Sequence, residues 1–116
     1  MPRIRKTKDF NPNNCPVTHC LNKIGGKWKP LIMYAISKNV NRFSTMQKAL
    51  PVISKQMLVN QLRELEEDGI ISRKEYEETP PRTEYTMTEY GNSLMPVLYA
   101  IQDWGIHDMK RIKTDS

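Results

Sequence analysis

The chain has few of the residues on which secreted domains, membrane proteins and enzymes depend. Its 116 residues include only Cys15 and Cys20, too few for a disulfide scaffold. No apolar run approaches a membrane span, and no apolar stretch follows the basic N-terminus as it would in a signal peptide. Two histidines, His19 and His107, without a phosphate loop or nucleophile motif, offer no catalytic constellation. We therefore expect a cytoplasmic protein with no membrane association, no catalytic residues and no cofactor.

Acidic residues are almost absent from the first half of the chain. Residues 1–63 contain twelve Lys or Arg and one acid, Asp9, whereas residues 64–116 contain six Lys or Arg and twelve Asp or Glu. The net charge is +5. This asymmetry predicts one surface that meets a polyanion such as nucleic acid, although a solvated basic surface would have the same charge.

The length fits one domain, which we place at residues 15–110, after a loose lead-in of residues 1–14 and before a tail of residues 111–116. Apolar spacing predicts a first helix that ends at Gly25-Gly26 and a second helix, with Pro30 in its first turn. The inward positions are Val17, Leu21 and Ile24 in the first helix, and Trp28, Leu31, Ile32 and Ala35 in the second. A short extended stretch, 40–43, follows.

Capping residues predict where the next helices begin. Ser44 and Gln47 form a capping box for a brief helix that closes before Pro51, and Ser54 caps a longer helix that ends at Gly69. Thr88 caps a last helix, which runs to about Lys110 with a kink at Pro96. The apolar stripe of the longer helix is Leu58, Leu62 and Leu65.

Two alternating segments predict a β-hairpin before the last helix. They are Ile71–Glu77 and Thr83–Met87, joined by the Pro-rich turn 79–82. The order of elements is then helix, helix, short strand, helix, helix, hairpin, helix. This order indicates a winged helix-turn-helix, an α+β fold that is mainly α, with extra helices at both ends.

The helix that begins at Ser54 is the candidate for reading DNA. Its N-terminal half is cationic and amide-rich, while its end is acidic, the reverse of what the helix dipole favours. Gln and Asn suit adenine, and Arg and Lys suit guanine. An ordinary amphipathic surface helix is the alternative. The predicted DNA-facing residues are Ser54, Lys55, Gln56, Val59, Asn60 and Arg63.

Cations outside this helix are candidates for phosphate contacts, although each taken singly is more often a solvated side chain. They are Lys48, Arg42, Lys27 and Lys29. Arg82, at the predicted hairpin tip, is placed to enter a minor groove, and a loop charge with no partner is the equal alternative.

The last helix carries more apolar surface than a small domain needs for its core. We predict that part of it, together with the first helix, forms a two-fold interface that sets two reading helices one turn of DNA apart. The alternative is that all of this surface is core. The predicted interface residues are Val17, Leu21, Leu98, Ile101 and Trp104.

Several short motifs resemble the HxlR family of bacterial and archaeal regulators over about residues 15–105. The resemblance implies a MarR-like winged-helix homodimer on a palindromic operator, acting as activator or repressor. The first and last helices would dimerise and the helix from Ser54 would read DNA. The matching segments include Cys15-Pro16-Val17, Ile24-Gly25-Gly26-Lys27-Trp28, 61–69, 80–85 and Asp103-Trp104-Gly105.

Cys15 is a candidate redox sensor. Some family members sense oxidants or electrophiles at this position, and a helix N-terminus favours a reactive thiolate. His19 and Lys23 would add positive charge; the alternative is a structural cysteine, which we expect Cys20 to be. Cys15 and His19 are too few ligands for a zinc site, so no metal is expected.

A winged-helix protein–protein adaptor that does not bind DNA is the competing function. It would use the apolar last helix on another polypeptide, and its binding would change little with salt, whereas DNA binding would weaken steeply.

Overall fold

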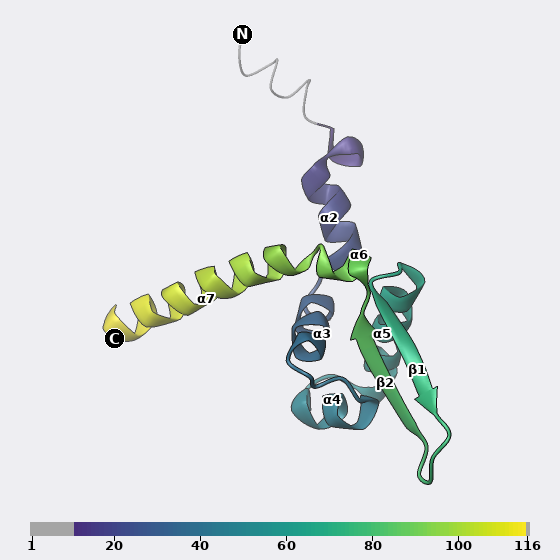
Figure 1. Cartoon of the computed structure of the whole chain (residues 1–116). Helices are drawn as coiled ribbons and strands as arrows, with labels where there is room; N and C mark the ends of the chain where they lie inside the picture. Colours follow the sequence, from purple (N-terminus) through teal and green to yellow (C-terminus); the bar gives the residue numbers. More distant parts are fainter. Residues whose placement is uncertain (1–10, 116) are drawn as a thin grey trace.

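The computed structural model describes residues 11–115 and has the predicted winged helix-turn-helix order (Figure 1). Most of the predicted lead-in lies outside the described residues. Within them, no helix is long and apolar enough to cross a membrane. The elements are the 3-10 turn η1 (Pro12–Asn14), α2 (Pro16–Ile24), α3 (Trp28–Ser37), α4 (Phe43–Ala49), α5 (Lys55–Glu67), β1 (Ile71–Tyr76), β2 (Arg82–Met87), α6 (Glu89–Asn92) and α7 (Met95–Asp115).

The ends of α5 form as its sequence predicts. The Ser54 hydroxyl accepts a hydrogen bond from the backbone N–H of Met57 at 3.0 Å, which satisfies one of the free donors of the first turn. Gly69 follows the helix with a φ of +75°, a conformation that side chains with a Cβ rarely adopt. Ser54 and Gly69 therefore set where α5 begins and ends.

The predicted capping box at Ser44 is wrong. Helix α4 begins at Phe43, and Arg42 occupies the N-cap position without a side-chain cap. Arg42 is extended because it forms a single β-bridge with Glu84, which is all that remains of the predicted strand at 40–43. The helix therefore starts where this bridge ends, and the Met46 N–H bonds to the Arg42 carbonyl at 2.9 Å.

The core lies between α3, α4, α5 and the hairpin. The predicted stripe of α5 is confirmed, but α3 is rotated relative to the prediction: Leu31 is exposed and Trp28 and Ala35 are half-buried. Met33 and Ile36 replace them, because they share a face with Ile32. The fully buried side chains are Ile32, Met33, Met46, Leu58, Leu62, Leu65, Ile70 and Ile71.

The hairpin is antiparallel, with Ile71 opposite Met87, and both predicted strands are confirmed to within one residue. Asn41 anchors its inner edge: the Asn41 carbonyl accepts from the Tyr85 N–H at 2.8 Å, and its side-chain amide donates to the Tyr85 carbonyl at 3.1 Å. This contact ties the hairpin to the segment before α4.

The C-terminal region differs from the single kinked helix that we predicted. Thr88 does cap a helix, since its hydroxyl accepts from the Gly91 N–H at 2.9 Å, but α6 ends at Asn92. Pro96 is the second residue of α7, where its missing N–H needs no partner. Helix α7 runs to Asp115 rather than to Lys110 and projects from the body as an arm (Figure 1).

Candidate nucleic-acid interface

From Lys55 to Arg63, α5 carries the predicted reading residues on its solvent side. Lys55, Gln56 and Arg63 are exposed, and Val59 and Asn60 are half-buried. The Gln56 side-chain amide donates to the Asn60 Oδ1 at 3.0 Å, so the two amides act as one hydrogen-bonding surface. The structure brings this part of the predicted site together.

The acidic end of α5 is used inside the protein. Glu64 Oε1 lies 2.7 Å from Lys29 Nζ, and Asp68 Oδ1 lies 4.0 Å from Lys23 Nζ. The charge gradient of α5 therefore has a structural cause, and it is not by itself evidence for DNA binding. Lys29 is only 9% exposed, so the prediction that it contacts phosphate is wrong.

The remaining predicted phosphate contacts are not all at this surface. Lys48 is exposed in the last turn of α4, next to α5 in the helix-turn-helix. Lys27 instead lies over the Trp28 ring, 4.9 Å from its centroid, and lines a groove between α3 and α7. The structure therefore does not bring Lys27 together with α5.

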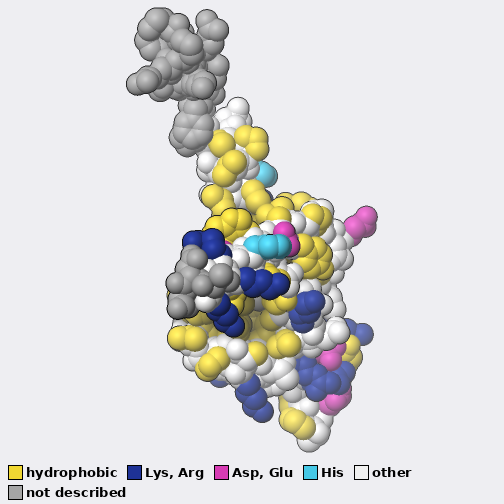
Figure 2. Space-filling view, turned by 90° about the vertical axis from the view of Figure 1, so that its left-hand side faces the viewer, with side chains coloured by type: hydrophobic (Ala, Val, Ile, Leu, Met, Phe, Trp, Pro, Cys, Tyr) yellow, Lys and Arg dark blue, Asp and Glu magenta, His cyan; other side chains and the backbone are white. Residues whose placement is uncertain are grey.

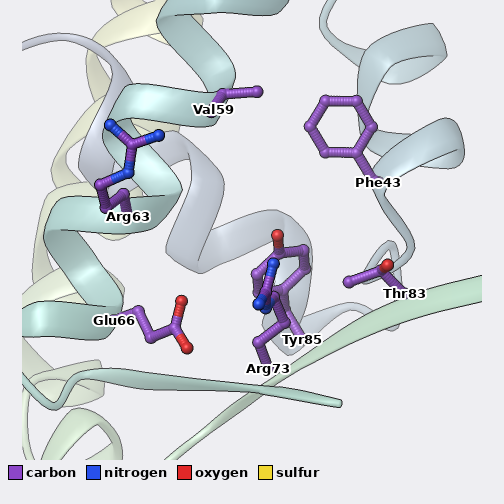
Figure 3. Close-up of a pocket in the computed structure, with 7 residues that line it drawn as sticks. All are labelled: Phe43, Val59, Arg63, Glu66, Arg73, Thr83 and Tyr85. Carbon is purple, nitrogen blue, oxygen red and sulfur yellow. The ribbon is translucent and has the colours of Figure 1, made fainter. Parts of the chain in front are cut away.

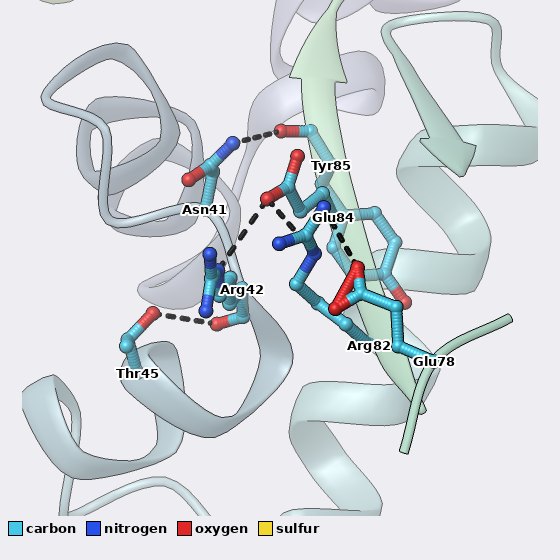
Figure 4. A network of polar contacts seen from close by, with 7 residues as sticks. All are labelled: Asn41, Arg42, Thr45, Glu78, Arg82, Glu84 and Tyr85. Atoms are coloured by element: carbon cyan, nitrogen blue, oxygen red, sulfur yellow. Dashed lines mark hydrogen bonds and ion pairs between the residues drawn. The ribbon is translucent and has the colours of Figure 1, made fainter. Parts of the chain in front are cut away.

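Arg42, just before α4, and Arg82, at the loop end of β2, share the carboxylate of Glu84 (Figure 4). Their Nε atoms lie 3.4 Å and 3.3 Å from Glu84 Oε2. Arg82 also lies 3.2 Å from Glu78 and 3.9 Å from the centroid of the Tyr76 ring. It begins β2 rather than standing at the tip, so it is not the free tip cation that the sequence suggested.

Sequence reasoning missed a hollow of about 340 Å³ between α5 and the hairpin (Figure 3). Arg73 of β1 and Tyr85 of β2 stand opposite each other in its floor, and Arg63 of α5 is at its edge. The alternation of side chains along the strand could have indicated the place of Arg73. This residue follows the inward-facing Ile71 by two positions, so it points to the same side of β1.

The predicted interface residues are exposed with one exception. Val17, Leu21, Ile101 and Trp104 are all more than half exposed, and Trp104 reaches 70%. Leu98 is buried in the core of this chain because the first turns of α7 rest on the body. Figure 2 shows hydrophobic side chains over α2 and around the base of α7.

Cys15 is the N-cap residue of α2. Cys15 makes no side-chain cap hydrogen bond, but the backbone N–H groups of Thr18 and Val17 near its sulfur lower the pKa of the thiol; the Thr18 hydroxyl adds to this effect and desolvation opposes it. The predicted contribution of His19 and Lys23 is not among these causes. Cys20 packs against the core as expected, and within residues 11–115 no three potential ligands gather around a metal position.

The comparisons with known proteins agree with this geometry. The model of the HxlR-like helix-turn-helix family matches residues 23–113. The chain belongs to the HxlR-like helix-turn-helix family. Two HTH-type transcriptional regulators of Bacillus subtilis strain 168 are similar to this HxlR-like chain: YdeP, 46% identical over 78% of this chain and 71% of its own length, and YybR, 42% identical over 88% and 83%. The family consists of transcriptional regulators, not enzymes.

Solved structures of related regulators have the same fold as this HxlR-like chain. The reduced form of the redox regulator HypR has a TM-score of 0.77 at 38% identity, over 86% of this chain and 99% of that one. A MarR-family transcriptional regulator from Porphyromonas gingivalis W83 has a TM-score of 0.75 at 32% identity, over 84% and 96%.

Proposed function

We propose that this HxlR-like protein is a sequence-specific DNA-binding regulator of transcription that acts as a homodimer. The observation that carries the proposal is the exposed, cation- and amide-bearing N-terminal half of α5 within a winged helix-turn-helix. Since its regulatory target would be chromosomal DNA, the proposal places the protein in the cytoplasm.

In this proposal α5 enters the major groove with its N-terminus first. The joined amides of Gln56 and Asn60 and the guanidinium of Arg63 reach base edges, while Lys55 and Lys48 bind phosphates. The acids at the other end of α5 stay away from the duplex, partly because Lys29 and Lys23 hold two of them.

A second copy of the chain is the proposed occupant of the exposed apolar surfaces of α2 and α7. A solvent-exposed Trp104 together with Ile101, Val17 and Leu21 is more apolar surface than a monomer normally leaves in water. A two-fold dimer would place two α5 helices about 34 Å apart, one turn of DNA.

Selection of genomic fragments by the purified protein, followed by sequencing, tests this proposal. We expect a palindromic site, an affinity that falls steeply with salt, and a larger loss of operator binding than of random-DNA binding in Asn60→Ala and Arg63→Ala. Lack of DNA retention, with salt-insensitive capture of another protein, would instead support the adaptor function.

A redox response through Cys15 is the finer part of the proposal. Its support is the lowered pKa of the Cys15 thiol and the similarity to the redox regulator HypR, whose structure is known in oxidized and reduced forms. We expect Cys15 to be alkylated at lower pH than an ordinary thiol, because its thiolate forms at lower pH. Diamide should change operator affinity in the wild type and in Cys20→Ser but not in Cys15→Ser. If Cys15→Ser responded to diamide as the wild type does, Cys15 would have no part in the mechanism.

A further inference from the structure

The hollow between α5 and the hairpin combines positive charge, hydroxyl groups and apolar walls (Figure 3). Two guanidinium groups reach it from different elements, Arg63 from α5 and Arg73 from β1. Thr83 and Tyr85 of β2 supply hydroxyls, and Phe43 and Val59 supply apolar surface. The lining residues are Phe43, Val59, Arg63, Glu66, Arg73, Thr83 and Tyr85.

Neighbouring side chains hold Arg73 in this hollow. It stands opposite Tyr85 in the hairpin register, and its Nη1 lies 3.3 Å from Glu75 Oε1. Burial raises the pKa of Tyr85, although the charge of Arg73 opposes this change, so the phenol keeps its proton and can act as a donor. Arg73 and Tyr85 therefore present a guanidinium and a hydroxyl from neighbouring strands to the same hollow.

The two acids near Arg73 do not prevent it from binding an anion. The Glu75 side chain is 65% exposed, and a surface ion pair of this kind contributes little. A guanidinium has five N–H donors, so Arg73 can keep Glu75 and still bind a second oxyanion. Glu66 also lines the hollow and its carboxylate opposes a bound anion, but Arg63 and Arg73 together leave the lining with one positive charge in excess.

The hollow borders the surface that α5 would present to DNA. Val59 and Arg63 line it and also belong to the predicted reading face. Of the two hairpin arginines on the described strands, Arg73 lines this hollow, whereas Arg82 lies with Arg42 beside Glu84. The DNA strand that borders the groove read by α5 would pass over this hollow.

We propose that this hollow binds one phosphate of the DNA backbone, with Arg73 as its main cation, Arg63 at its edge and the Thr83 and Tyr85 hydroxyls as further donors. The proposal rests on the proposed function. The Phe43 and Val59 side chains exclude part of the water around the phosphate, which strengthens its attraction to Arg73. Arg73 would position the protein on the duplex without reading sequence.

Salt-dependent binding of operator and random duplexes tests the assignment. Arg73→Gln keeps most of the side-chain length but removes the charge. We expect the plot of log affinity against log salt to become less steep by about 0.9 for each protomer bound, equally on both duplexes. Arg73→Lys should restore most of the slope because it restores the charge. Lys74→Gln is the matched control, because it removes a cation from the same strand but from the face that points away from the hollow. Its salt slope should equal that of the wild type.

Neutral methylphosphonate linkages identify the phosphate. A methylphosphonate at one position in each half-site should weaken DNA binding by the wild type. The same substitution should not weaken DNA binding by Arg73→Gln any further. An unchanged slope in Arg73→Gln while the wild type binds DNA would overturn this inference alone, as would a loss confined to the operator. If the wild type retained no duplex, the proposed function and this inference would both fail. Thermal unfolding of each variant shows that the comparison is between folded proteins.

Discussion

The body of the molecule, from α3 to β2, buries its apolar side chains, whereas α7 leaves most of its own in solvent. Ile32, Leu58 and Leu62 are inaccessible in the body, but Trp104 and Met109 of α7 are mostly exposed. Both regions show helical apolar spacing in the sequence. The difference teaches that such spacing identifies a surface to be covered, and that only the three-dimensional arrangement shows whether this chain covers it.

The largest effect should come from the core of the body. Leu62→Ala removes a buried side chain of α5 and should lower the free energy of unfolding by about 2–5 kcal/mol, because a cavity remains. Denaturant unfolding at one fixed protein concentration measures this change. Val52→Ala is the control, since its side chain is 81% exposed and should contribute less than about 0.5 kcal/mol. Equal losses would show that the body is not packed as described.

The arm should behave in the opposite way. Trp104→Ala should weaken dimerisation by about 2 kcal/mol, roughly thirtyfold, because a large aromatic side chain at an interface centre contributes this much. The free energy of unfolding extrapolated to the monomer should change little. Sedimentation equilibrium measures the dissociation constant, with Tyr90→Ala of α6 as an aromatic control. If the wild type were monomeric, or both variants dimerised as the wild type does, α7 would need another partner.

An ion pair joins two helices of the body. Glu64→Ala leaves the ammonium of Lys29, whose side chain is 11% exposed, without its carboxylate, and should cost about 1–2 kcal/mol in unfolding experiments. Glu67→Ala is the control, because it also removes an exposed acid near the C-terminal end of α5 but not the one that contacts Lys29. A similar loss in both variants would mean that the helix dipole, and not the contact with Lys29, sets the effect.

Much of the fold was predictable because its signals are local. The stripe of α5, its cap at Ser54 and the two strands all follow from residues within a few positions of one another. The rotation of α3 was not predictable in this way. It places Lys29 inside and Leu31 outside because Lys29 meets Glu64, a residue far along the chain.

The candidate site divides in the same manner. The reading residues of α5 follow from helical spacing, so the sequence indicated their common face. The pairing of Arg42 and Arg82 depends on which carboxylates and rings the hairpin brings to them, and no spacing rule gives this. Formal charge alone therefore overestimated the free cations of the wing and missed Arg73.

The two serines that the sequence treats alike provide the finest test of this distinction. Ser54→Ala should cost about 1 kcal/mol of unfolding free energy, because the Met57 N–H loses its acceptor at the start of α5. Ser44→Ala should cost close to nothing, since Ser44 lies inside the first turn of α4 and caps no helix. Denaturant unfolding of both variants measures the difference. Equal costs would mean that α4 begins at Ser44 after all, and that the bridge between Arg42 and Glu84 does not set the start of this helix.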